Sequence, residues 1–171
     1  EFRDLEKTLK CGKNTINEYD DEIPSDLTAE QILIRSGNIG SVRIAQLIGL
    51  EKFKKFMNEL NLIGSIEFDI EEMGIPVSFR WGKCKLATAS YGHGVTTTIL
   101  QLANAYSIIV NGGYKINPTL IKKNKYLKQK KILKKDVSKK INSILRKIVT
   151  TKEGTASLAN VDGYEIGGKT G

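Results

Sequence analysis

Two short patterns in this sequence combine residue types that can carry acyl-transfer chemistry. The first is Ser36 and Asn38, separated by one residue, and the second is Lys169-Thr170-Gly171. A serine hydroxyl can relay a proton, an asparagine amide can donate and accept hydrogen bonds, and a lysine can place positive charge beside a carboxylate. Each pattern alone is a weak signal, because such triplets occur by chance. A plain helix-to-helix turn and an ordinary strand end would use the same residues.

Thr28 and Gln31 indicate that a helix begins after Thr28. Their spacing is that of a capping box, in which each side chain bonds to the backbone of the other residue. The helix should break at residues 36–38, because Ser, Gly and Asn favour turns over helix interiors. A second helix is predicted over residues 38–48, with Gly49 as its stop. Its predicted buried stripe contains Ile39, Val42, Ala45 and either Leu47 or Ile48.

Three further helices are predicted downstream. The first runs over residues 51–63 and ends at Gly64. The second begins at a cap formed by Thr96 or Thr97 and is apolar on most faces, which indicates a buried core helix. The third covers residues 136–150, and its apolar face consists of Val137, Ile141, Ile144, Leu145 and Ile148.

Residues 65–90 show no clear periodicity and are predicted to form a long irregular connection. The last residues contain turn-forming types followed by the short apolar approach of a strand that reaches Lys169. There is no internal repeat and no low-complexity linker. The sequence therefore predicts one mostly helical domain that ends as a sheet begins.

The net charge of +8 comes from one segment. Residues 121–147 hold 12 lysines or arginines and one acidic residue, whereas the rest of the chain holds 15 basic and 18 acidic residues. We interpret the segment as a solvated face, and contact with anionic lipid or a cell-wall polymer is the functional alternative. Its only aromatic residue is Tyr126, and it has no recognised motif, so we expect no nucleic-acid binding.

Cys11 and Cys84 lack a C-x-x-C pairing and a histidine at metal-ligand spacing, so we expect no metal site. The sequence leaves open whether they form a disulfide. His93 lies between two glycines without the serine and aspartate of a triad, which favours a structural role in a loop. No apolar run approaches the roughly 18 residues of a membrane span, and no signal-peptide pattern opens the chain.

The order of these patterns resembles the active-site motifs of penicillin-binding proteins. "RSGNIGSVRIA" resembles the S-x-N motif with its helix, and "EGTASLANVDGYEIGGKTG" resembles the turn leading into the K-T-G strand. Between them, "SYGHGVTTTILQLANAYSIIVNGG" is similar to the signature that separates the second and third motifs. The resemblance covers about residues 20–171. It is closest to the class B transpeptidases, and the "SYGHG" region is most like the division-specific septal type.

The resemblance implies an α/β (α+β) fold, the penicillin-binding transpeptidase or serine β-lactamase-like fold. Residues 1–171 would form a partial transpeptidase domain with mainly the helical subdomain and the start of the active-site strand. The family places its nucleophile in S-x-x-K, before S-x-N. No serine here has lysine three residues later. We therefore expect the nucleophile upstream of Glu1, further strands after K-T-G, and no activity from this chain alone.

The resemblance also implies roles for the two patterns. Ser36, Asn38 and Lys169 would be catalytic: the serine relays a proton to the leaving nitrogen, the asparagine binds substrate and holds the nucleophile's lysine, and Lys169 tunes the relay. Thr170 and Gly171 would bind substrate, through a hydroxyl near the terminal carboxylate and through close backbone approach. Acyl transfer of this kind needs no metal and no organic cofactor.

The predicted function is cross-linking of peptidoglycan stem peptides ending in D-Ala-D-Ala, with β-lactams as inhibitors and other division proteins as partners. The parent protein would be anchored in the bacterial inner membrane with its catalytic domain on the outer face. Alternatives within the fold are an elongation-type or bifunctional penicillin-binding protein, a β-lactamase and a β-lactam sensor. An alternative of another class is a basic scaffold module that binds a polyanion.

Overall fold

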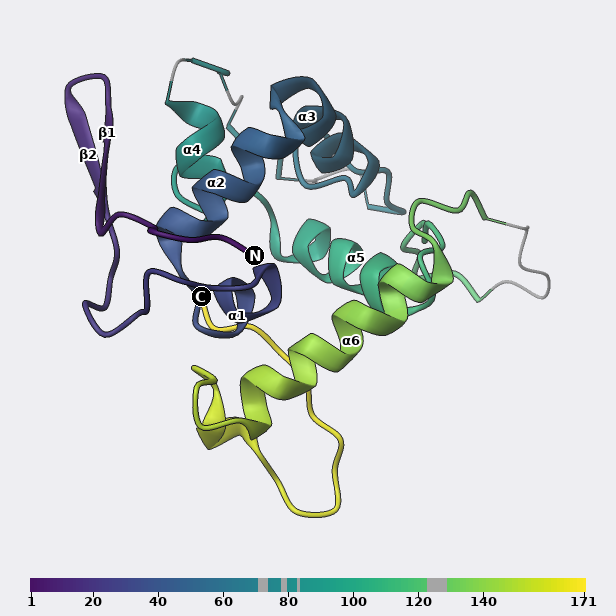
Figure 1. The fold of residues 1–171 in the computed structure, drawn as a ribbon. Helices are drawn as coiled ribbons and strands as arrows, with labels where there is room; N and C mark the ends of the chain where they lie inside the picture. Colours follow the sequence, from purple (N-terminus) through teal and green to yellow (C-terminus); the bar gives the residue numbers. More distant parts are fainter. Residues whose placement is uncertain (71–73, 78–79, 83, 123–128) are drawn as a thin grey trace. The chain divides into compact units, whose positions relative to one another are not determined.

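The computed structural model describes residues 1–70, 74–77, 80–82, 84–122 and 129–171, which are mainly helical (Figure 1). The chain forms two compact units. The first unit consists of Glu1–Phe53, Arg80–Val95 and Ser143–Gly171, and the second consists of Lys54–Phe79 and Thr96–Asn142. Each unit has its own group of buried apolar side chains, and each is described by itself below.

The first unit contains a hairpin that the sequence did not lead us to predict. Strands β1 (Thr8–Cys11) and β2 (Asn14–Asn17) pair antiparallel across a two-residue turn, in which Gly12 adopts a φ of +63°. Cys11 at the end of β1 forms a disulfide with Cys84. The question left open by the sequence is thus resolved, and the bond ties the hairpin to a segment 73 residues away.

Helix α1 (Ala29–Ile34) begins at the predicted capping box. The Gln31 backbone N–H donates to the Thr28 hydroxyl (3.2 Å), and the Thr28 N–H donates to the Gln31 side-chain oxygen (2.9 Å). These bonds satisfy backbone donors that have no partner within the helix. The helix ends two residues before Ser36, so the predicted break is confirmed.

Helix α2 (Asn38–Ile48) stops at Gly49, whose φ of +82° is unfavourable for other residues, as predicted. The buried part of its stripe consists of Ile39, Val42 and Ala45. Leu47 is 79% exposed and Ile48 is 43% exposed, so the prediction was wrong for the last turn. The reason is that β2, α1 and α4 contact α2 and leave this turn open.

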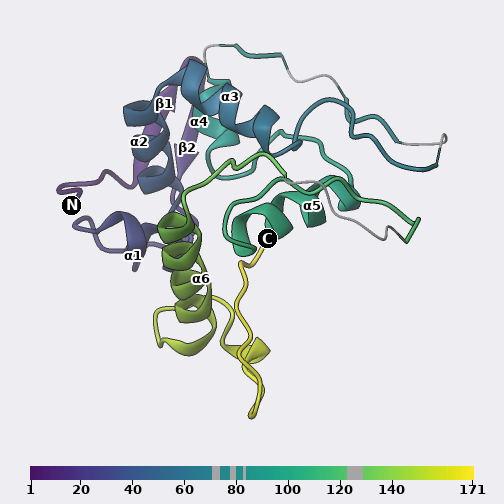
Figure 2. The same cartoon turned by 90° about the vertical axis from the view of Figure 1, so that its right-hand side faces the viewer.

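A short helix, α4 (Lys85–Ala89), lies within the stretch that was predicted to be irregular. Figures 1 and 2 both show the hairpin, α2 and α4 side by side. Their shared core consists of Ile16, Ile39, Val42 and Ala87, with Leu9, Cys11 and Tyr91 packed against it. A second core under α1 contains Ile23, Leu27 and Ile32.

Helix α6 (Lys135–Thr150) continues from the second unit into the first. Of its predicted apolar face, Ile144, Leu145 and Ile148 are buried, whereas Val137 is 44% exposed. A 3-10 turn over Ser157–Ala159 follows. Residues 164–171 form no strand, which corrects the prediction of an active-site strand. A strand requires a ladder of backbone bonds to a neighbour, and here Gly168 N–H donates to Leu145 in a helix instead (3.1 Å).

The second unit holds most of α3 (Leu50–Glu59) and all of α5 (Ile99–Val110). The helix predicted over residues 51–63 is present, but it ends at Glu59 rather than at Gly64. The cap of α5 is Thr98 rather than Thr96 or Thr97, because only Thr98 forms the reciprocal box with Gln101 (3.2 and 3.0 Å).

The prediction that α5 is buried on most faces was wrong. Ile99 is 90% exposed and Leu102 is 46% exposed, whereas Gln101 is fully buried. The Gln101 amide donates to the carbonyls of Asn61 and Gly64, both at 2.9 Å. A buried polar side chain therefore satisfies its own hydrogen-bonding groups by holding two loop carbonyls.

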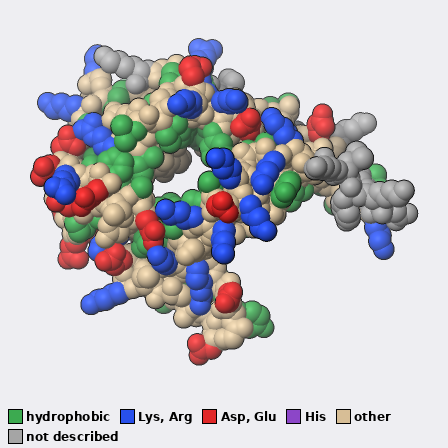
Figure 3. All heavy atoms as spheres, turned by 45° about the vertical axis from the view of Figure 1, so that its right-hand side comes forward, with side chains coloured by type: hydrophobic (Ala, Val, Ile, Leu, Met, Phe, Trp, Pro, Cys, Tyr) green, Lys and Arg blue, Asp and Glu red, His purple; other side chains and the backbone are tan. Residues whose placement is uncertain are grey.

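Basic side chains are interspersed with acidic ones on the face shown in Figure 3. Part of the lysine-rich segment, residues 123–128, lies outside the described residues. In the part of the chain that the structure describes, no helix is both long and apolar enough to cross a membrane.

Candidate functional site

The structure brings together the two patterns that the sequence places 133 residues apart. The Lys169 ammonium donates to the Ser36 hydroxyl at 2.6 Å. It also donates to the carbonyl oxygen of Thr170 (2.8 Å) and to the Thr170 hydroxyl (3.1 Å). These contacts place one cation between two hydroxyl groups, an arrangement that can pass a proton and bind an anion. The yellow C-terminal residues in Figure 1 accordingly end beside α1.

Ser36 occupies the joint between α1 and α2 in a conformation that few residues other than glycine adopt. Its φ is +61°, in the left-handed region. The turn closes through bonds from Ser36 N–H to the Leu33 carbonyl (3.3 Å) and from Gly37 N–H to the Ile32 carbonyl (2.9 Å). Local strain at such a position persists where surrounding contacts fix it, and it is common at functional sites.

Lys169 is positioned by the approach of the C-terminal segment to α6. Arg146 donates to the carbonyl of Ile166 at 2.8 Å. A Cβ at Gly167 would lie 3.2 Å from the backbone nitrogen of Arg146, so glycine permits this close approach. The Thr155 and Thr170 hydroxyls share a hydrogen bond of 2.7 Å. Thr155 therefore contacts the site residue Thr170 from a neighbouring turn.

Ser36, Lys169 and Thr170 line a pocket of about 310 Å³ in the first unit. Asn38 and Gly171 lie in its wall with Ser36, Lys169 and Thr170, so all five residues predicted from the sequence meet in one place. The rest of the lining consists of Ile32, Leu33, Ser41, Ser90 and Tyr91. Gly171 has no side chain, so its backbone can approach a bound ligand more closely than that of other residues.

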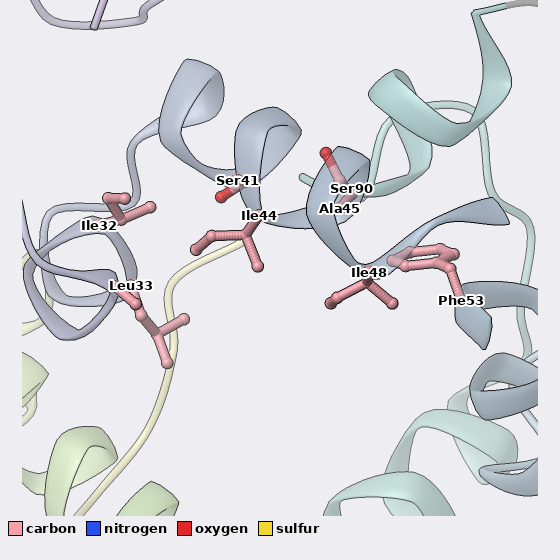
Figure 4. Close-up of a pocket in the computed structure, with 9 residues that line it drawn as sticks. Ile32, Leu33, Ser41, Ile44, Ala45, Ile48, Phe53 and Ser90 are labelled. Carbon is pink, nitrogen blue, oxygen red and sulfur yellow. The ribbon is translucent and has the colours of Figure 1, made fainter. Parts of the chain in front are cut away.

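An apolar pocket of about 190 Å³ adjoins this site and shares Ile32, Leu33, Ser41 and Ser90 with it. Figure 4 shows Leu33, Ile44 and Ile48 directed toward the same space. Among the described residues its lining has no charged side chain, whereas the neighbouring pocket contains the Lys169 ammonium. The cation therefore lies in the pocket around Ser36.

Burial shifts two titratable groups in the polar pocket. The pKa of Lys169 is lowered because its ammonium is partly removed from water. The pKa of the Tyr91 hydroxyl is raised for the same reason, since burial disfavours its charged form. Among the residues that the structure describes, no Asp or Glu lines the pocket, so none of these carboxylates there opposes the loss of the lysine proton. Within the described ranges, no cluster of three histidine, cysteine or acidic residues could hold a metal ion.

Sequence reasoning missed several residues that shape the site. Glu18 accepts hydrogen bonds from the backbone at the start of α2, and Tyr19 donates to the carbonyl of Arg35. Tyr91 lines the pocket and stacks on His93, whose N–H donates to the Thr88 carbonyl. The alternating "TLKC" and "NTIN" around a Gly-Lys pair could have indicated the hairpin that carries Glu18.

Comparison with solved structures identifies the fold. The structure is similar to the apo transpeptidase domain of Burkholderia pseudomallei penicillin-binding protein 3, with a TM-score of 0.88, 22% identity, and coverage of 98% of this chain and 51% of that chain. It also resembles a peptidoglycan glycosyltransferase from Burkholderia ambifaria, with a TM-score of 0.88, 23% identity, and coverage of 99% and 54%. The predicted α/β transpeptidase fold is confirmed.

The sequence assigns the family. Residues 2–171 match the model of the penicillin binding protein transpeptidase domain, so the chain belongs to that family. A probable peptidoglycan D,D-transpeptidase FtsI of Caulobacter vibrioides is 28% identical over 98% of this chain and 29% of the relative. Stage V sporulation protein D of Bacillus subtilis is 30% identical over 82% and 24%. The predicted class B relationship is confirmed, and the chain spans less than a third of these relatives.

Proposed function

We propose that this chain is part of a peptidoglycan D,D-transpeptidase that cross-links stem peptides by serine acyl transfer during septal wall synthesis. The observation that carries the proposal is the 2.6 Å contact between Lys169 and Ser36 inside a pocket. The family assignment and the relative named FtsI support the septal role. The substrate would be a stem ending in D-Ala-D-Ala, and β-lactams would compete for the same site.

In the proposed reaction a serine hydroxyl attacks the carbonyl carbon of the penultimate D-Ala. The new bond is an ester, the amide C–N bond breaks, and the leaving nitrogen takes a proton through Ser36. An amine on a second stem then attacks the ester, releasing the serine. The nucleophile would come from a part of the parent protein outside these 171 residues, because no serine here has lysine three residues on.

The remaining site residues have roles that fit their positions. Lys169 would keep the Ser36 hydroxyl oriented and place positive charge near the substrate's terminal carboxylate, and the Thr170 hydroxyl would bind that carboxylate. Asn38 would donate to a substrate carbonyl. The absence of a side chain at Gly171 would let the peptide backbone lie alongside. The parent would work at the outer face of the inner membrane with other division proteins.

Covalent labelling of the full-length parent by fluorescent penicillin tests this proposal. Ser36→Ala and Lys169→Ala should each slow labelling by about 100-fold or more, the range typical of proton-transfer groups. The matched controls Ser65→Ala and Lys152→Ala remove an exposed serine and an exposed lysine, and they should label normally. Full labelling in both site variants would refute the roles, and rapid release of the label would indicate a β-lactamase instead.

A further inference from the structure

We propose that Glu18 and Tyr19 are positioning residues that hold the Ser36–Asn38 turn in the geometry that acyl transfer requires. They follow directly after β2 and lie outside both sequence motifs. The inference rests on the proposed function, since these residues act through Ser36 and Asn38.

Glu18 caps α2 from a distance of 20 residues in sequence. One carboxylate oxygen accepts from the Asn38 N–H at 2.7 Å, and the other accepts from the Ile39 N–H at 2.9 Å. The first N–H groups of a helix have no partner within it, and Gly37 at the cap position offers no side chain. A carboxylate also interacts favourably with the positive end of the helix dipole. Glu18 therefore supplies the cap that the S-x-N sequence lacks.

The residues on both sides of Glu18 bind the same turn. The Tyr19 hydroxyl donates to the carbonyl of Arg35 at 2.6 Å, immediately before Ser36. The side-chain amide of Asn38, two residues after Ser36, donates to the carbonyl of Asn17 at 3.0 Å. Three consecutive residues thus fix the two flanks of a serine whose left-handed φ is unfavourable. We call residues 17–19 the clamp.

The clamp follows a hairpin that packing and a disulfide join to the rest of the first unit. It begins at the last residue of β2, and Ile16 in that strand is buried against α2. The disulfide between Cys11 and Cys84 joins the hairpin to the start of α4. Because α4 is followed by Ser90 and Tyr91 in the pocket lining, one connected assembly holds two walls of the site.

Glu6 provides a matched control for Glu18. Both are carboxylates of the first unit that bind α2, but Glu6 pairs with the side chain of Arg43, in the middle of the helix. Arg43 lines neither pocket described above. Removing the charge of Glu6 therefore changes an ion pair on α2 without touching the turn that carries Ser36.

The test is the penicillin acylation rate constant of the full-length parent. Glu18→Gln keeps the size of the side chain but replaces one acceptor oxygen by a donor, so one of the two backbone bonds is lost. We expect acylation to slow about 10- to 100-fold, as for a displaced catalytic group. Glu6→Gln should stay within about twofold of the wild type, because an exposed ion pair contributes little. A wild-type rate for Glu18→Gln would overturn the inference.

A second measurement separates positioning from general destabilisation. If Glu18 acts through Ser36, Glu18→Gln should slow acylation much less in a Ser36→Ala background than in the wild type. An equal slowing in both backgrounds would contradict the clamp. Should Glu18→Gln fail to fold, Tyr19→Phe decides: slower acylation supports the clamp and an unchanged rate overturns it. A different result would contradict the proposed function itself, namely labelling of the Ser36→Ala variant at the wild-type rate.

Discussion

The two units of this chain use polar side chains for different purposes. In the second unit the Gln101 and Asn104 amides donate to loop carbonyls and hold these loops onto α5. The Ser138 hydroxyl donates to the Ile109 carbonyl and joins α6 to α5. In the first unit the polar groups of Ser36 and Lys169 bind each other and line an open pocket. A buried polar residue therefore does not identify a site by itself. What distinguishes the first unit is that its polar groups converge where a ligand can enter.

The lysine-rich segment and the predicted site residues lie mainly in different units. Ten of the twelve basic residues of the segment 121–147 belong to the second unit, yet all five residues predicted to act on substrate belong to the first. A single lysine held by two hydroxyl groups is thus a stronger indication of chemistry than many solvated ones. Four predictions test this contrast.

The largest effect is expected from the disulfide of the first unit. Cys11→Ser with Cys84→Ser should lower the free energy of unfolding by about 2–4 kcal/mol, because the bond closes a long loop and restricts the unfolded chain. Thermal unfolding of the full-length parent, followed with and without reductant, measures the loss. A wild-type protein whose unfolding temperature is insensitive to reductant would contradict the stabilising role of this bond.

Alkaline pH should affect the first unit through Lys169. Burial lowers the pKa of this lysine, so its ammonium loses the proton at a pH below the ordinary value of 10.5. Acylation that needs the cation should then fall about tenfold per pH unit above that pKa. Lys169→Arg keeps its charge, so this alkaline decline should disappear even if the overall rate is lower. The same decline in both proteins would assign it to another group.

The two capping boxes offer a direct comparison between the units. Thr28→Ala and Thr98→Ala should each cost about 1 kcal/mol of stability, because each removes the cap of one helix. Only Thr28→Ala should also slow acylation, since α1 leads directly into Ser36. Unfolding in urea and the acylation rate at low temperature give the two quantities. Equal slowing by both variants would contradict a specific role of α1 in positioning Ser36.

The smallest effect is expected from the lysines of the second unit. Lys139→Gln and Lys140→Gln change exposed side chains of α6, and surface substitutions of this kind shift stability by no more than about 0.5 kcal/mol. Acylation should be unchanged. Binding of the parent to vesicles with and without anionic lipid tests the alternative role, and a loss of binding in these variants would give the lysine-rich segment a function.

Features set by neighbouring residues were predictable from the sequence. The Thr28 box, the break before Asn38 and the stop at Gly49 each depend on a few adjacent side chains, and all three are present. The meeting of Ser36 with Lys169 was expected only through the family resemblance. No local rule brings together residues 133 positions apart.

Two wrong predictions are local, namely the cap of α5 and the end of α3, and the others concern contacts between distant segments. The strand expected at Lys169 needs a neighbouring strand, which the described residues do not supply. The apolar residues of α5 predicted a buried helix, but the sequence did not show that the side chain of Ile99 is exposed to solvent. Glu18 was missed because a carboxylate that caps a helix from 20 residues away has no signature in its own neighbourhood.

The central claim is that Ser36, Lys169 and Thr170 form one acylation site. A crystal structure of the full-length parent acylated by a penicillin tests it most directly. The account predicts that the nitrogen released from the lactam lies within about 3.2 Å of the Ser36 hydroxyl, and that the drug's carboxylate contacts Lys169 or the Thr170 hydroxyl. An acyl group bound away from this pocket, or a carboxylate held by other residues, would contradict it.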